Sequence, residues 1–285
     1  MRKILKWIGI VLAALVGLLF VVVAGLSISS NSRLNKTYTI QPEAVEIPTD
    51  AAAIAEGERL ASIYCAGCHG DNLGGTDFFN EPAIAVFDAS NLTTGSGGVG
   101  SYFTDEDWAR AIRHGVDPEG KPLFIMPSKD FYYFSDEDLG QIIAFLKAAP
   151  PVNNNANDFQ MGFMGRLLLA VGAFGDVVNA ETINHTAARP HAPVPGASAE
   201  YGSYLVQTVG CSTCHGENLT GGTGPEPGAP PGPDITSTGN LGSWAEADFI
   251  LQMRARKSEF MPFESLAKMS DEELSAIYLY LQSLP

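Results

Sequence analysis

The chain has 285 residues, 45% of them hydrophobic, and a formal net charge of -15 at pH 7. This length predicts about two globular domains. The first 30 residues contain Arg2, Lys3 and Lys6 and no acidic residue, so the remaining 14 basic and 32 acidic residues carry a net charge of -18. Such an acidic surface repels a phosphate backbone, which excludes nucleic acid as a partner.

An uninterrupted apolar segment lies close to the N-terminus. Residues 7–26 contain no charged side chain, and about 20 such residues span a membrane. This is longer than the apolar core of a typical cleaved signal peptide. Basic residues before the segment predict a cytoplasmic N-terminus, with all later residues on the opposite side. We expect a membrane anchor at 1–28 and a tether at 29–49; the alternative is cleavage near Val22–Ala24.

Two copies of a C-x-x-C-H motif contain all four cysteines. Their residues are Cys65, Cys68 and His69 in the first copy and Cys211, Cys214 and His215 in the second. On a helix, positions i, i+3 and i+4 share one face, so both sulfurs and the imidazole of each copy point the same way. Two thioether bonds to a porphyrin and an axial imidazole attach a c-type haem. The motifs therefore predict two covalently bound haem c groups, with the histidines as iron ligands.

Other cysteine chemistry fits the pattern less well. A structural zinc site needs four ligands, whereas each motif supplies two cysteines and one histidine, and the motifs start 146 residues apart. A thioredoxin-type C-x-x-C lies in a βαβ unit, and the sequence lacks that alternation. Haem attachment is the favoured interpretation.

The sequence around the motifs is repeated. Three pairs of segments match: Gly57–Leu60 with Gly202–Leu205, Met126–Pro127 with Met261–Pro262, and Ser135–Leu139 with Ser270–Leu274. A duplicated supersecondary unit of this kind predicts tandem domains of the same fold. We place the domains at 50–150 and 198–285, joined by an interdomain segment at 151–197.

Both copies are predicted to be mainly helical. Each closing helix begins with a capping box, at Ser135 and at Ser270, and continues with apolar residues at helical spacing. Earlier helices are expected at about 51–65 and 105–114 in the first copy and at 199–211 and 246–256 in the second. The Gly- and Pro-rich connections between them predict loops around a flat cofactor rather than a continuous sheet.

Met126 and Met261 are the candidates for the sixth iron ligand. Each precedes a proline and lies between the third and last helix of its copy. A thioether is a soft, neutral ligand that raises the potential of a haem, and the proline keeps the preceding residue out of a helix. His114 is a rival ligand in the first copy, but its counterpart in the second copy is Ala255. The repeat therefore favours the methionines.

The interdomain segment contains an apolar stretch at Phe159–Val178, in which only Arg166 and Asp176 are charged. Its four glycines and the arginine argue against a second membrane span. We expect a helix packed between the two domains. The alternative is a surface that touches the membrane or a partner subunit.

Four further segments carry a family resemblance: Ser90–Thr93, Phe103–Trp108, Ile112–Gly115 and Asp136–Leu139. Together with the haem and Met-Pro motifs, they resemble class I-type dihaem cytochromes c, over most of residues 50–285. The likeness is closest to the cytochrome subunits of membrane-bound periplasmic dehydrogenases, which commonly carry three haems. The resemblance implies that the carbonyl group of Pro233 orients the ligand histidine of the second copy. Ser90 replaces this proline in the first copy.

The sequence thus predicts a transmembrane helix followed by two tandem cytochrome c domains. We expect a dihaem cytochrome on the periplasmic face of a bacterial inner membrane. It would relay single electrons between a membrane complex or dehydrogenase and another redox protein, without being an enzyme itself. One alternative is a dihaem peroxidase or oxidoreductase, which requires an iron with an open position. The other is a haem-bearing structural subunit of a respiratory or photosynthetic complex.

Overall fold

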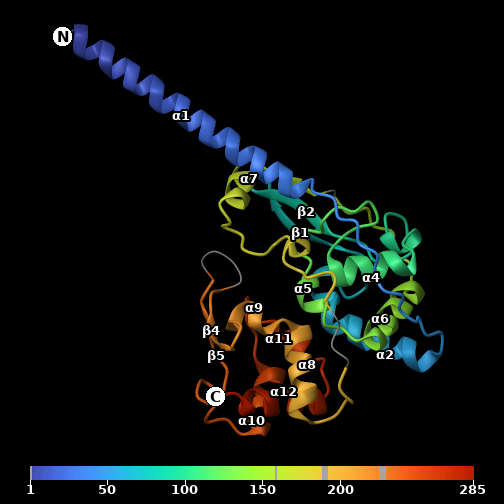
Figure 1. Ribbon diagram of the computed structural model, residues 1–285. Helices are drawn as coiled ribbons and strands as arrows, with labels where there is room; N and C mark the ends of the chain where they lie inside the picture. Colours follow the sequence, from blue (N-terminus) through green and yellow to red (C-terminus); the bar gives the residue numbers. More distant parts are fainter. Residues whose placement is uncertain (1, 158, 188–191, 225–228) are drawn as a thin grey trace.

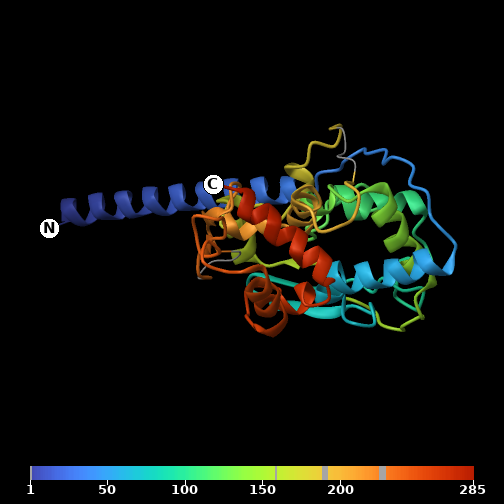
Figure 2. The same cartoon turned by 90° about the horizontal axis from the view of Figure 1, so that it is seen from below.

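The computed structural model describes residues 2–157, 159–187, 192–224 and 229–285. One long helix projects from a globular part that contains both repeats (Figure 1), and the view at right angles shows the same projection (Figure 2). Most regular structure is helical, as predicted.

The projecting helix, α1, spans Arg2–Leu34. Among the described residues it is the one helix that is long and apolar enough to cross a membrane. Its side chains are exposed as far as Val22 and become partly covered from Val23 onward. The helix therefore continues six residues past position 28 and enters the globular part before it ends.

The first domain is built from five helices, and the structure contains every helix predicted for it. They are α2 (Ala51–Tyr64), α3 (Ala66–His69), α4 (Asp105–His114), α5 (Ser128–Phe131) and α6 (Asp136–Ala148). The Asp50 carboxylate accepts a bond from the Ala53 N–H at the start of α2, and Thr104 forms a capping box at the start of α4. These caps fix where each helix begins. A core of buried aliphatic and aromatic side chains then joins α2, α4 and α6.

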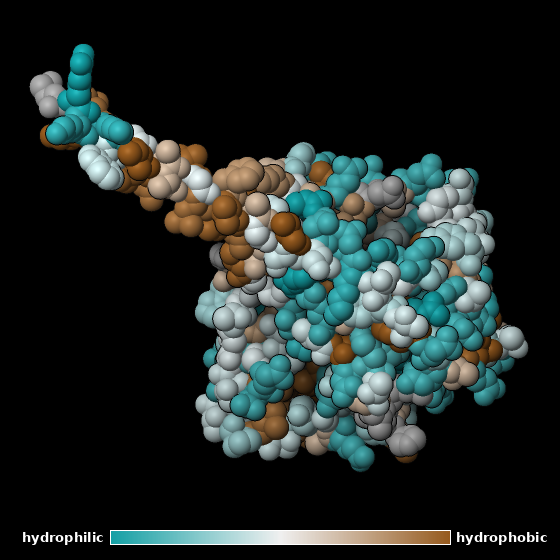
Figure 3. Space-filling model, turned by 45° about the horizontal axis from the view of Figure 1, so that its top comes forward, coloured by the Kyte–Doolittle hydropathy of each residue, from teal (hydrophilic) through white to brown (hydrophobic). Residues whose placement is uncertain are grey.

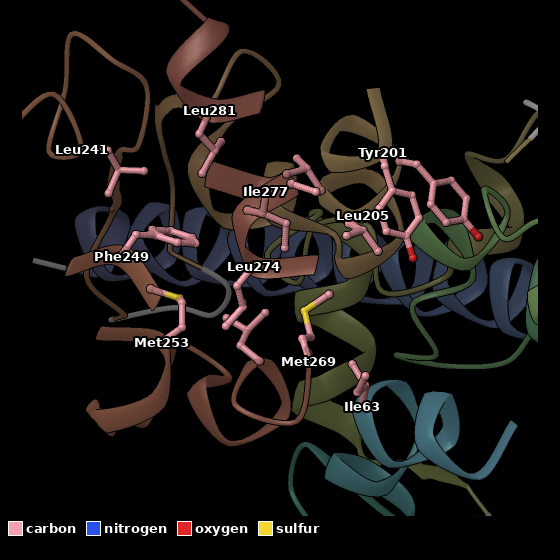
Figure 4. Close-up of a cluster of buried hydrophobic side chains, with 14 of the residues drawn as sticks. Ile63, Tyr201, Leu205, Leu241, Phe249, Met253, Met269, Leu274, Ile277 and Leu281 are labelled. Atoms are coloured by element: carbon pink, nitrogen blue, oxygen red, sulfur yellow. The ribbon is translucent and has the colours of Figure 1, made fainter. Parts of the chain in front are cut away.

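The second domain repeats this arrangement with α8 (Ala199–Val209), α9 (Cys211–His215), α10 (Glu246–Ala255), α11 (Phe263–Leu266) and α12 (Asp271–Ser283). Leu274, Ile277 and Leu281 of α12 form the centre of its core, with Phe249 of α10 beside them (Figure 4). Ile63 of α2 also belongs to this cluster. The two domains therefore share part of one core.

The domains meet through equivalent elements. Helix α5 of the first domain contacts α8, and α11 of the second contacts α2. The Arg59 guanidinium donates two bonds of 2.9 Å to the Glu273 carboxylate. At the positions related by the repeat, the Tyr204 hydroxyl donates to the Asp138 carboxylate. Both pairs join the helix that precedes one haem motif to the start of the closing helix of the other domain, so the interface has approximate twofold symmetry.

Short strands form where only loops were expected, so this part of the prediction is wrong. An antiparallel three-stranded sheet contains β1 (Thr76–Glu81), β2 (Ala85–Ala89) and β3 (Gln160–Met161), and β4 (Thr220–Gly222) pairs with β5 (Gly232–Asp234). Ala85 and Phe87 alternate with half-buried residues along β2, and the Phe87 ring lies against Phe78, Phe79, Phe124 and Phe159. Burial of these rings stabilises the hairpin.

Helix α7 (Phe163–Ala170) lies beside α1, as Figure 1 shows. Its Leu169 is buried against Ala85 and Phe87 of β2. The expectation of a helix between the two domains is therefore wrong. The β1–β2–β3 sheet offers α7 an apolar face that is next to α1 instead.

Close packing of two helices in each domain depends on a glycine. A Cβ atom at Gly202 of α8 would lie 1.9 Å from the Ala276 carbonyl oxygen of α12, whereas a Cβ at Gly67 would have 3.6 Å to its nearest neighbour. We predict that Gly202→Ala destabilises the second domain by about 3 kcal/mol and lowers its Tm by roughly 15 °C. Thermal unfolding followed by circular dichroism, with Gly67→Ala as the control, tests this. Equal Tm values for the two variants would contradict the helix packing described here.

Candidate haem sites

The first candidate site is a cavity of about 410 Å³ in the first domain. Cys65, Cys68 and His69 lie on its wall, and Met126 also lines it. Cys65 ends α2 and starts α3, and Gly70 ends α3 with φ of 80°, a conformation that favours glycine. This short helical turn places the three motif side chains at the same cavity.

The second candidate site is a cavity of about 270 Å³ in the second domain. Cys211, Cys214, His215 and Met261 line it together with apolar side chains of α10 and α12. The structure thus brings all eight predicted site residues to two cavities, four at each. Because the two cysteine pairs line separate cavities, they do not combine into one zinc site.

A backbone carbonyl orients each motif histidine. His69 Nδ1 lies 2.7 Å from the Ser90 carbonyl oxygen, and His215 Nδ1 lies 2.8 Å from that of Pro233. A carbonyl can only accept a hydrogen bond, so Nδ1 carries the proton and Nε2 retains its lone pair. Burial lowers the pKa of His69, which favours the neutral form that binds metal. Ser90 therefore performs through its backbone what Pro233 does in the second domain.

No disulfide joins any of the four cysteines, so all four sulfurs are available for attachment of a cofactor. Among the described residues, no group of three or more His, Cys, Asp or Glu side chains is arranged to hold a metal ion.

The two methionines occupy matching turns. The Met126 carbonyl accepts a 2.8 Å bond from the Ser128 N–H, and the Met261 carbonyl accepts one of the same length from the Phe263 N–H. In each case the following proline is the N-cap of a short helix, α5 or α11. The repeat therefore extends from the sequence to the local fold. This agreement strengthens the expectation that the methionines have the same role.

The lining of the first cavity contains an unpaired polar atom that fits a haem. Trp108 is only 2% exposed, and its indole Nε1 has no hydrogen-bond partner among the described residues. An acceptor such as a haem propionate would satisfy this donor. The thiols, neutral imidazole, thioether and apolar walls are also the groups that a c-type haem requires. The residues present therefore fit this cofactor.

His114 lies outside both cavities. Its Nδ1 is 3.0 Å from Nδ1 of His185, and its Nε2 is 3.7 Å from a carboxylate oxygen of Glu43. Burial lowers the pKa of His114 to about 4. This buried cluster joins the tether to the interdomain segment, so His114 is not placed to bind the first iron. Sequence reasoning missed the cluster because its members belong to three distant segments.

Hydrogen bonds across the domain interface connect residues that lie close to the two cavities. Tyr64 lines the first cavity, and its hydroxyl lies 3.1 Å from that of Thr208, three residues before Cys211. Asp130 lies on α5, just after the Met126 turn, and its carboxylate accepts a hydrogen bond from Thr213 inside the second motif. Burial raises the pKa of Asp130 to about 6. The methionine turn of the first domain thus contacts the cysteine segment of the second.

The fold and the two cavities define a pair of c-type cytochrome domains. Residues 52–146 match the family of cytochrome c oxidase, cbb3-type, subunit III, and residues 199–285 match the cytochrome c family. Both repeats therefore belong to the cytochrome c families, which implies one haem c in each and a role in electron transfer.

Curated relatives with similar sequences are cytochrome subunits. The chain is 26% identical to the fructose dehydrogenase cytochrome subunit of Gluconobacter japonicus over 84% of its length. It is 29% identical to the gluconate 2-dehydrogenase cytochrome c subunit of Pantoea cypripedii over 82%. It is 25% identical to the alcohol dehydrogenase (quinone) cytochrome c subunit of Gluconobacter oxydans over 83%. The matches cover 54%, 60% and 55% of these relatives, so the chain spans little more than half their length.

The methionine assignment predicts a spectroscopic result. The oxidised protein should show the charge-transfer band of Fe(III) bound to a thioether sulfur, because each methionine lines the same cavity as a histidine motif. Met126→Ala and Met261→Ala should each remove about half of the band, and the double variant all of it. Met269→Leu, a change in a buried methionine outside both cavity linings, is the control. A full band in either alanine variant would contradict that assignment.

Proposed function

We propose that the protein is a membrane-anchored dihaem c-type cytochrome that relays single electrons on the periplasmic side of a bacterial inner membrane. In each domain the two cysteines would bind haem covalently, and the histidine and methionine would be the protein ligands of its iron. The haem would supply a one-electron iron centre. The protein would supply the attachment of the haem, the ligands of its iron and its exclusion from water.

One observation carries this proposal: two cysteines, a histidine and a methionine line each of the two cavities, and a backbone carbonyl orients the histidine in both. A pair of sites with equal ligand sets suits successive one-electron transfers. The interface contacts between the Met126 turn and the second cysteine motif support exchange between the two sites. They hold α5 of the first domain against the cysteine segment of the second.

The enzyme alternative requires an open iron position. Met126 and Met261 both lie at a cavity wall, and a bound methionine would close the sixth position in both domains. This arrangement favours electron transfer over peroxide chemistry.

Helix α1 supports the proposed membrane placement. Residues 7–26 have the length and composition of a single span, and basic residues precede it. The globular part would then lie on the opposite side from the N-terminus. Haem attachment to C-x-x-C-H motifs in an exported chain fits the periplasm.

The relatives suggest the class of electron donor. They are cytochrome subunits of fructose, gluconate and alcohol dehydrogenases. We infer that a dehydrogenase or another membrane complex delivers electrons to this chain. The net charge of -18 beyond the first 30 residues favours encounter with a basic soluble acceptor.

Electron exchange with such an acceptor tests the function. The reduced full chain in detergent should transfer about two electrons to a basic soluble cytochrome c in stopped-flow mixing, one from each haem. The rate should fall as salt is added, because the Debye length shortens to about 8 Å at 0.15 M. An acidic cytochrome of similar size is the matched control; it should react slowly at low salt, and its rate should rise as salt screens the repulsion. Absent exchange, together with rapid peroxide turnover, would favour the enzyme instead.

A further inference from the structure

Helix α7 and the turn after it expose a set of apolar side chains beside α1. Phe163 is 61% exposed, Met164 47% and Val171 63%. We call these three residues the apolar foot. The opposite side of α7 is buried, since Gly165 and Leu169 face the sheet and its core. The apolar foot is therefore the free face of a helix that is apolar on both sides.

Polar contacts fix α7 to the end of α1. Arg33 forms an ion pair with Glu181 at 2.7 Å, and its guanidinium also donates a 2.8 Å bond to the Leu169 carbonyl. From α7, Arg166 donates a 3.1 Å bond to the Asn31 side chain. These bonds hold α7 alongside α1. The position of the apolar foot along α1 is therefore defined.

That position corresponds to the edge of a bilayer. If residues 7–26 fill the hydrocarbon core, Asn31 lies five residues further on, or about 8 Å along a helix that rises 1.5 Å per residue. This is the depth of the headgroup layer, where amphipathic helices lie. In Figure 3 the hydrophobic surface of α1 continues onto the globular part where the helix enters it. The apolar foot thus continues the surface of the membrane anchor.

Basic residues gather at the same place in an otherwise acidic protein. Lys121 Nζ donates a 3.1 Å bond to the Asn35 carbonyl, just after α1, and Lys36 lies 4.6 Å from the centre of the Tyr38 ring. Together with Arg166, they have no carboxylate partner within ion-pair distance among the described residues. Each basic group near an anionic membrane surface contributes about 1 kcal/mol of attraction.

We propose that the apolar foot is a second membrane contact, in which Phe163, Met164 and Val171 enter the headgroup boundary. Lys36, Lys121 and Arg166 would face the lipid phosphates. This inference rests on the proposed membrane anchoring by α1. It adds a fixed orientation, because α7 with the neighbouring β1 and β2 would rest on the membrane surface beside the end of α1 (Figure 1).

Lipid photolabelling of the wild-type protein tests the contact. The haem-loaded full chain is placed in nanodiscs of phosphatidylcholine and phosphatidylglycerol in equal parts, doped with a phospholipid that carries a diazirine near the headgroup. Mass spectrometry then locates the labelled peptides. Residues 163–173 should be labelled about fivefold above the peptide with Leu251, an equally exposed side chain (60%) on α10. Labelling should fall when phosphatidylglycerol is omitted.

Matched variants give the second measurement. Phe163→Asp with Val171→Asp should lower labelling of the foot to the level of the Leu251 peptide and leave α1 labelled, whereas Leu251→Asp should change neither. Labelled α1 with an unlabelled foot in the wild-type protein would overturn this inference and leave the anchor proposal standing. No labelling of α1 would overturn both.

Discussion

The site depends on a hydrogen bond between an imidazole and a backbone carbonyl. His69 and His215 each point Nδ1 at a carbonyl oxygen, at 2.7 and 2.8 Å. This bond fixes the tautomer and leaves Nε2 as the only nitrogen that can bind iron. It needs no particular side chain at the acceptor, so Ser90 replaces Pro233 without loss of the contact. What must be preserved is the path of the backbone at the acceptor. Ser90 directly follows β2, and Pro233 lies within β5.

The interface between the two repeats uses a different kind of bond at each of its two equivalent positions. The two repeats meet through equivalent helices, and the repeat-related positions Arg59 and Tyr204 both bond an acidic residue at the start of the opposing closing helix. The Glu273 carboxylate also completes its own capping box with Ser270, so it is well satisfied although nearly buried. Asp138 instead accepts from Tyr204. The same geometry is thus kept by an ion pair on one side and by a hydroxyl donor on the other.

Much of the helical fold could be predicted from local signals. The C-x-x-C-H spacing and the Ser135 and Ser270 caps depend on residues that are close in sequence, and the matching Met-Pro turns appear in both copies. The three-stranded sheet could not be predicted in this way. β1 is rich in exposed residues, and its stability comes from Phe87 and from aromatic rings that lie far apart in the sequence.

The position of α7 could not be predicted from the sequence for the same reason. An apolar stretch such as Phe159–Val178 has no local feature that selects its partner, and the choice between domain interface and α1 depends on which apolar face is left uncovered. Here the sheet provides that face next to α1. The role of Ser90 was likewise hidden, because a backbone acceptor leaves no mark on residue type.

We propose that both domains hold an iron with no open position, which suits electron relay rather than chemistry on a bound substrate. Titration of the reduced full chain with carbon monoxide tests this proposal, because this ligand binds ferrous haem only where a sixth position is free. The absorption spectrum of both haems should remain unchanged. A shifted spectrum at either haem, in the protein as isolated, would contradict it.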